Sequence, residues 1–260
     1  MIEWVIVLGV AIVSALLLLE SHGIVLAYHS TAVVEDDKYT IRPKRIMRSI
    51  YLLKCLGYQP GFGEMLSADN IVKEKIRRWL LITFDDAYRD NFHFIIWLLK
   101  HGYRVVVFMP TAQLGQTNAW DKGAKRLMTF EEAEYLAGLG AVFASHGHLH
   151  QRMTQMPSEI LKDEILTSRA EIQKLMHGRD DFIAYPYGDY NDNVLSVMKE
   201  SGVQFGFSTI PRSVYFSRSS RNLEIGRLSM RRDWTISDML SAWILMRLRG
   251  WKQIIRSCYD

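Results

Sequence analysis

Apolar and polar positions follow a regular order along most of the chain. From residue 23 onward, short runs of β-branched and apolar residues are each followed by a stretch with helical spacing. Such runs predict strands, and apolar residues at intervals of three and four predict helices. The predicted strands are 24–29, 79–86, 104–110, 141–146, 182–188, 205–209 and 223–230. The predicted helices are 42–57, 91–102, 129–140, 157–177 and 189–201.

The order of these elements indicates an α/β fold. Strands that are apolar throughout and separated by helices are typical of a parallel sheet that is covered on both faces. About seven such units predict a closed or nearly closed (β/α) barrel, and an open doubly wound sheet is the alternative. Because the sequence shows no internal repeat and no linker, we expect residues 23–235 to form one domain.

The N-terminal segment has a different composition. Residues 4–19 form an uninterrupted apolar run, and no Lys or Arg precedes it. An apolar run without a basic start or a small-residue cleavage site predicts an uncleaved membrane-anchor helix within residues 1–22. A buried helix of the domain and a cleaved signal peptide are the alternatives. The anchor predicts a single-pass protein of the cell membrane, with the membrane as a partner.

The side of the membrane stays open. Basic residues follow the apolar run and favour a cytoplasmic domain, but most lie at or beyond the range in which the positive-inside rule holds. The C-terminal residues 236–260 predict a basic amphipathic helix. Such a helix either lies on an anionic membrane surface or caps the barrel.

Overall charge and cysteine content exclude some classes of function. The formal net charge is only +4, and the sequence has no dense Lys/Arg block and no Gly-rich phosphate loop. We therefore expect no nucleic-acid partner. The two cysteines, Cys55 and Cys258, form neither a metal-binding spacing nor a disulfide framework. The oligomeric state cannot be inferred from the sequence.

Residues suited to catalysis or metal binding stand at the ends of the predicted strands. The second strand ends in Asp85 and Asp86, and the fourth leads into His146 and His150. These ends meet at one mouth of a parallel barrel. Two imidazoles and one carboxylate make a three-ligand site for a divalent metal, and zinc suits such ligands best. If the chain turns into a helix after residue 146, the spacing of four places both imidazoles on one face.

These stretches resemble a known family. "TFDDAYRDN", "SHGHLHQRM" and "FIAYPYG" are similar, in order and spacing, to the three leading motifs of the polysaccharide deacetylases, the NodB-homology domain of carbohydrate esterase family four. The stretches "AYHS", "VVVFMP" and "LMTFEEAEYLAGLG" agree as well, so the resemblance covers about residues 24–230. It implies a distorted (β/α) barrel and metal-dependent removal of acetyl groups from sugars.

The resemblance also implies a role for each matching residue. Asp85 would act as the general base that takes a proton from the attacking water. Asp86, His146 and His150 would hold one divalent metal ion, expected to be zinc. In "YPYG", Tyr187 would offer its backbone N–H to the developing oxyanion. An N-acetylated glycan or glycolipid is the expected substrate. The resemblance also favours a domain outside the cytoplasm, in contrast to the basic residues after the apolar run.

The sequence departs from the family pattern at several positions. Ala87 follows the acid pair where the family usually has Gly, and we expect an unstrained turn there. Many members carry an Arg at the position of Ala184. We expect Arg227, near the end of the last strand, to orient Asp85 instead.

The late Leu-x-His motif, which supplies a catalytic acid in many members, is absent. We assign the acid to His29, because it ends the first strand at the barrel mouth. The branch that deacetylates poly-N-acetylglucosamine is similar, since it takes its acid from an early Tyr-His. His148 lies between the two predicted histidine ligands, and we expect it to point away from the metal.

The sequence leaves three other functions open. An O-acetyl esterase and a small-amide deacetylase would use the same attack on a carbonyl. A catalytically inactive carbohydrate-binding domain would need neither a base nor a metal. The intact set of acids and histidines argues against this last alternative.

Overall fold

The structure is a computed structural model of the 260-residue chain. It describes residues 22–32, 37–61, 78–121, 125–211, 214–215, 222–235 and 237–245. The predicted anchor, except for the backbone of its last residue, lies outside the described residues, and so does much of the predicted C-terminal helix. Among the helices within the described ranges, none has the length and apolar character needed to cross a bilayer.

Strands and helices alternate along the chain as the sequence predicts. The strands are β1 (His22–Tyr28), β2 (Gln59–Pro60), β3 (Arg78–Phe84), β4 (Val105–Met109), β5 (Val142–Ser145), β6 (Gly178–Ala184), β7 (Phe205–Ser208), β8 (Val214–Tyr215), β9 (Ile225–Gly226) and β10 (Leu228–Ser229). The helices between them are α2 (Pro43–Cys55), α4 (Phe92–Lys100), α5 (Phe130–Gly138), α6 (Ser158–Ile172) and α7 (Asp192–Glu200). The two-residue strands β2 and β8 were not predicted, because they are too short to show a period.

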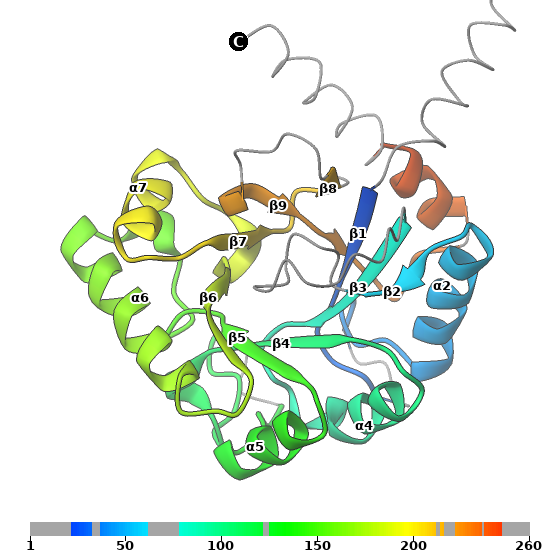
Figure 1. The fold of residues 1–260 in the computed structure, drawn as a ribbon, viewed down its shortest axis with the longest axis horizontal. Helices are drawn as coiled ribbons and strands as arrows, with labels where there is room; N and C mark the ends of the chain where they lie inside the picture. Colours follow the sequence, from blue (N-terminus) through cyan, green and yellow to red (C-terminus); the bar gives the residue numbers. More distant parts are fainter. Residues whose placement is uncertain are drawn as a thin grey trace, which may run out of the picture.

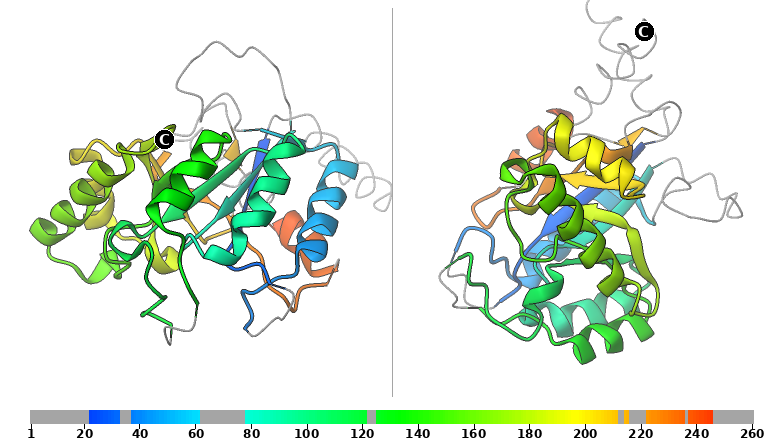
Figure 2. Two further views of the ribbon diagram at one scale, coloured as in Figure 1. Left: turned by 90° about the horizontal axis from the view of Figure 1, so that it is seen from below. Right: turned by 90° about the vertical axis from the view of Figure 1, so that its left-hand side faces the viewer.

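Apart from the short β8, which pairs antiparallel with β1, the strands are parallel and form a ring with the helices outside it (Figure 1). Neighbouring strands follow the order β10-β1-β3-β4-β5-β6-β7-β9. Figure 2 shows from two further sides that the helices form an outer layer around the strands. The predicted fold class, a distorted (β/α) barrel, is therefore confirmed.

The last predicted strand differs from the prediction. Residues 223–230 do not form one strand but contain β9 and β10, with Arg227 between them. β9 pairs with β7 through Gly226, and β10 pairs with β1 through Leu228. One kinked segment therefore joins the two ends of the sheet and closes the ring.

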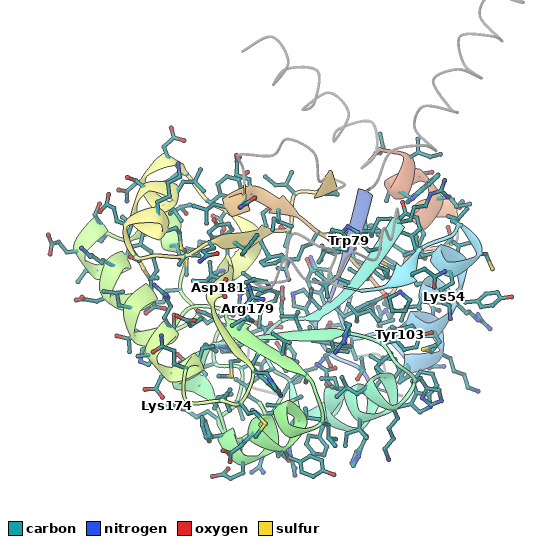
Figure 3. All side chains as sticks on the ribbon, in the orientation of Figure 1. Lys54, Trp79, Tyr103, Lys174, Arg179 and Asp181 are labelled. Carbon is teal, nitrogen blue, oxygen red and sulfur yellow. The ribbon has the colours of Figure 1, made fainter. Side chains whose placement is uncertain are left out.

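Each strand sends alternate side chains to opposite faces of the barrel. In β3, Trp79 and Leu81 belong to the cluster inside the ring, whereas Leu80 and Ile82 pack outward beneath the helices. Trp79 is fully buried and lies among the strands (Figure 3). Burying one such large apolar side chain contributes about 1.5–3 kcal/mol to folding. This alternation determines which residues beyond each strand point into the mouth.

Residues 237–245 are helical and pack against α2. The buried Met239 lies 3.2 Å from the hydroxyl of Ser49, and the indole N–H of Trp243 donates to the hydroxyl of Tyr58 at 2.9 Å. These contacts attach the described part of the C-terminal segment to the outside of the barrel.

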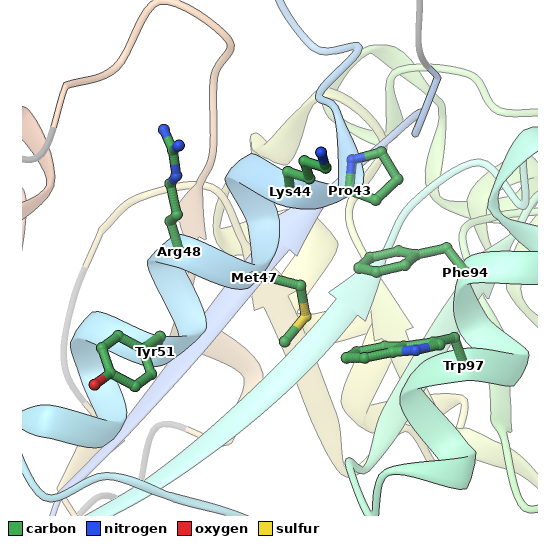
Figure 4. Close-up of a pocket in the computed structure, with 7 residues that line it drawn as sticks. All are labelled: Pro43, Lys44, Met47, Arg48, Tyr51, Phe94 and Trp97. Carbon is green, nitrogen blue, oxygen red and sulfur yellow. The ribbon is translucent and has the colours of Figure 1, made fainter.

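A groove of about 580 Å³ runs between α2 and α4 on the outer, helical side (Figure 4). Its floor is apolar, and two basic side chains stand along α2. The lining residues are Pro43, Lys44, Met47, Arg48, Tyr51, Phe94 and Trp97. It contains none of the residues at the strand ends that the sequence analysis singled out.

A buried ion pair links the closing segment to the end of β3. Arg227 is fully buried, and its two terminal nitrogens donate to the two carboxylate oxygens of Asp85 at 2.6 and 2.8 Å. The guanidinium also donates to the hydroxyl of Thr83 at 3.2 Å. Burial raises the pKa of Asp85, but the charge and hydrogen bonds of Arg227, together with the nearby His146 and His29, lower it more, so the pKa lies below the usual range.

Replacing Arg227 with Met should destabilise the protein by about 3–5 kcal/mol at neutral pH, because a buried carboxylate loses its partner. Asp85 in the native protein contributes stability that is present above about pH 4 and is lost as the pH falls through its depressed pKa. In the variant, burial without a partner raises the pKa of the same carboxyl. Acidification therefore protonates it and removes the cost of burying an unpaired charge. The deficit, measured by urea unfolding at several pH values, should therefore narrow from pH 7 to pH 4.

The control is the double variant Arg227→Met with Asp85→Asn. It removes the charge as well as its partner, and it should recover more than half of the lost stability. If both variants lost the same unfolding free energy at pH 7 and at pH 4, the loss would come from packing and not from the ion pair.

Candidate active site

The period of two in the strands aims three polar side chains into the barrel mouth. Along β3, the inward series of residues 79, 81 and 83 continues to Asp85. Ala144 in β5 points inward, and the next inward position is His146. In β1 the inward series starts at Val25 and reaches His29 after two steps of two residues. The rule that successive side chains point to opposite faces therefore predicts this part of the site.

Asp86, His146 and His150 form a compact buried cluster. The Nε2 atoms of His146 and His150 lie 3.5 and 3.1 Å from Oδ1 of Asp86. All three residues are at most 5% exposed, and one ligand atom from each lies within 4.8 Å of the others. The structure thus brings together the three residues predicted as metal ligands.

The cluster has the features that a divalent metal requires. Bonds of about 2.0–2.2 Å to tetrahedral ligands place the ligand atoms roughly 3.3 Å apart, which is close to the two distances from Asp86 to the histidines. Oδ1 of Asp86 is buried and has no hydrogen-bond partner, although two imidazole nitrogens face it. Buried polar atoms are rarely left unpaired, so this oxygen fits a metal ligand better than a hydrogen-bond acceptor.

His146 is held in the form that can bind a metal. Its Nδ1 lies 2.8 Å from the carbonyl oxygen of Ala184, which fixes the proton on Nδ1 and leaves the Nε2 lone pair free. Burial lowers the pKa of His146 to about 4, although the charge of Asp85 opposes this shift. The ring is therefore neutral at physiological pH.

The two histidines predicted as ligands do not share a helical face, so that part of the sequence prediction is wrong. Residues 146–152 form a loop after β5. Gly147 has φ +78 and His150 has φ +57, and these left-handed residues turn the chain so that both imidazoles point to Asp86. His148, as predicted, lies outside the cluster, with its Nδ1 2.8 Å from the hydroxyl of Thr111.

The two adjacent carboxylates have separate partners. Asp85 is bound by Arg227, the residue expected to orient it. Burial raises the pKa of Asp86, but contact with His150 and the nearby His146 lowers it more, so the net pKa lies below the usual range. Both acids are therefore ionised at neutral pH in spite of their burial.

The turn after the acid pair is strained, which corrects the expectation for Ala87. Asp86 has φ +68 and Ala87 has φ +53. An L-residue in this region costs about 1–2 kcal/mol, which glycine avoids. The preference for Gly at this position therefore has a conformational reason, and Ala87 carries the cost here.

His29 follows β1 at the same mouth. It lies close enough to Asp85 and Asp86 to interact with their charges. Its ring stacks on Tyr39 at 4.8 Å, and its Nδ1 is buried without a hydrogen-bond partner. The side-chain amide of Asn91 donates to the carbonyl oxygen of His29 at 2.6 Å, which holds the backbone of this residue.

Two aromatic side chains flank the cluster. Tyr187, with φ +63, is 45% exposed, and its ring lies 5.1 Å from that of His150. The ring of Trp120 also stacks on that of His150, with 4.0 Å between the ring centroids. Trp120 was not predicted from the sequence, because it belongs to the long connection between β4 and α5, where no periodic pattern marks it.

Comparison with known proteins agrees with this site. The family model for polysaccharide deacetylase matches residues 73–206, which is about half of the chain. YxkH of Bacillus subtilis, whose name assigns it to the polysaccharide deacetylases, is 27% identical over 72% of this chain and 64% of its own length. The poly-β-1,6-N-acetyl-D-glucosamine N-deacetylase of Staphylococcus epidermidis is 27% identical over 64% of this chain and 59% of its own length.

A solved structure shares the fold. The Streptococcus pyogenes deacetylase PplD, solved with acetate, superposes with a TM-score of 0.69 at 19% identity and covers 85% of this chain and 97% of its own. The matched region spans less than two thirds of the length of both sequence relatives. On the family model, the chain belongs to the polysaccharide deacetylase family.

Proposed function

We propose that the protein is a metal-dependent deacetylase that hydrolyses the acetamido groups of an N-acetylated glycan or glycolipid. The observation that carries this proposal is the buried cluster of Asp86, His146 and His150 next to Asp85. Membership of the family supports the reaction class. The name of the Staphylococcus relative supports an N-acetylglucosamine polymer as the class of substrate.

Asp86, His146 and His150 would hold the metal, and two nitrogens with one oxygen suit zinc. Bound there, a divalent metal lowers the pKa of a water from about 16 to about 7 and polarises the acetyl carbonyl. Three protein ligands would leave at least one coordination position for water.

Asp85 would accept the proton of the attacking water. It is ionised at neutral pH, and Arg227 fixes the direction of its carboxylate through both oxygens. Each oxygen retains a second lone pair for the proton. A base held in one orientation beside the reacting atoms needs no rearrangement before the transfer.

His29 would deliver a proton to the leaving nitrogen. The sugar nitrogen is a very poor leaving group as an anion, so cleavage of the amide C–N bond needs an acid that protonates this nitrogen. The stacking on Tyr39 and the bond from Asn91 restrain His29 at the mouth. Tyr187 would donate its backbone N–H to the developing oxyanion, and removing such a donor costs about 3–4 kcal/mol of barrier.

The proposed function predicts acetate release from N-acetylglucosamine oligomers by the purified full-length chain. Release should stop when a chelator removes the metal and should return when zinc is added back. Release from O-acetylated sugars alone would point to the esterase. Oligomer binding with no release in the presence of zinc, cobalt or nickel would leave a carbohydrate-binding domain as the better account.

The two adjacent acids should respond differently to the same substitution. Asp85→Asn should keep the metal and lose about 10²- to 10⁴-fold in turnover, the usual contribution of a general base. Asp86→Asn should lose metal and turnover together, because it removes a ligand. Metal content by elemental analysis and acetate release measure both effects. Equal loss of metal in the two variants would contradict the division of roles.

Substrates with different leaving groups test the role of His29. His29→Ala should retain metal and lose turnover on acetamido sugars, by about 10²-fold or more. It should lose far less on an activated acetate ester, whose leaving group departs without a proton. Tyr39→Leu is a milder companion variant, because it removes only the stacking partner of the ring. Losses of the same size on both substrates would exclude His29 as the acid.

A further inference from the structure

The loop that carries the two histidine ligands is attached to α6 by a buried carboxylate. Glu164 is only 6% exposed, and its Oε1 accepts the backbone N–H groups of His148 at 2.8 Å and Leu149 at 2.7 Å. A charged side chain is rarely buried to this degree unless it is paired. Here its partners are two consecutive amides that lie between His146 and His150.

A second contact joins the same loop to the same helix. The N–H of Gly147 donates to the hydroxyl of Ser145 at 3.0 Å, and that hydroxyl donates to Ser168 at 2.8 Å. Ser168 is buried and stands one turn after Glu164 on α6. The acceptors for three successive N–H groups of the loop therefore depend on one face of this helix.

The carbonyl groups of the loop are held from the other side. The N–H groups of Thr111 and Ala112, just after β4, donate to the carbonyl oxygens of Gly147 and His148 at 3.1 and 2.9 Å. The loop thus lies between two supports, with its donors directed to α6 and its acceptors directed to the end of β4.

The backbone of the loop needs such support. His150 has φ +57, a conformation that costs a non-glycine residue about 1–3 kcal/mol unless its surroundings impose it. Gly147 has φ +78, and a Cβ at this position would lie 3.0 Å from Oε1 of Glu164. A side chain at residue 147 would therefore crowd the carboxylate against the loop.

We propose that Glu164 is a positioning residue for the metal site: it holds the loop in the conformation that points His146 and His150 at Asp86. This inference rests on the proposed function, since it assigns the loop to metal binding. Residues that support metal ligands from outside typically affect metal affinity by about 10- to 100-fold when they are removed. Without the carboxylate, the N–H groups of His148 and Leu149 would lose their common acceptor, and the loop could relax.

Two substitutions test the proposal. Glu164→Ala removes the acceptor, whereas Glu164→Gln keeps an amide oxygen that can accept both N–H groups. The matched control is Asp163→Ala, which removes the same charge from the adjacent, exposed position of α6. The first readout is zinc affinity of the metal-free protein, measured by competition with a chromophoric chelator. The second is hydrogen exchange of the amides of residues 147–150.

Glu164→Ala should bind zinc about 10- to 100-fold more weakly and should exchange the amides of His148 and Leu149 faster. Glu164→Gln should recover most of both losses, and Asp163→Ala should match the native protein. Rescue by Gln separates this role from a need for the negative charge. All measurements are made at a temperature at which urea unfolding shows that every variant is folded. This separates the positioning role from general destabilisation.

Native zinc affinity and native exchange in Glu164→Ala would overturn the proposal. So would faster exchange spread evenly over the barrel, which would indicate a role in general stability. Failure of the native protein itself to bind zinc, cobalt or nickel would refute the proposed function. In that case the exchange of residues 147–150 would still show whether Glu164 holds the loop.

Discussion

The pairing of a buried guanidinium with a buried carboxylate determines how this barrel closes and what its mouth can do. Arg227 occupies the single position between β9 and β10, inside the ring, where an uncompensated charge would be costly. Asp85 supplies the compensating charge from the end of β3. The same contact keeps Asp85 ionised and directs its oxygens, so an ion pair located where the barrel closes also prepares the proposed base.

Much of this arrangement follows from the order of residues along the strands. The period of two continues past the strand ends, so Asp85 and His146 could be placed in the mouth from the sequence, and the acids and histidines could be grouped there. The pairing of Arg227 with Asp85 was inferable only as a guess, because Arg227 is a basic residue near the end of the last predicted strand. The break that separates β9 from β10 had no local signal, because it results from pairing with two distant strands.

What the sequence did not indicate lies in the loops. No pattern marks Trp120 as the partner of His150, and none distinguishes a loop from a helix after residue 146. Four of the non-glycine residues with positive φ in the described structure are at the site: Asp86, Ala87, His150 and Tyr187. Their conformations run against local preference and persist because contacts from other elements impose them. Local sequence rules therefore fail where the fold overrides them.

The join between β10 and β1 also bears on how the chain folds. Leu26 and Leu228 are paired although about two hundred residues separate them, and contacts between such distant positions form slowly because a long loop must close first. Arg227 can reach Asp85 only when this join has formed. A chain still emerging from the ribosome therefore carries every proposed metal ligand before it carries Arg227, the partner of the proposed base. The proposed site is complete only when β10 has been made and has joined β1.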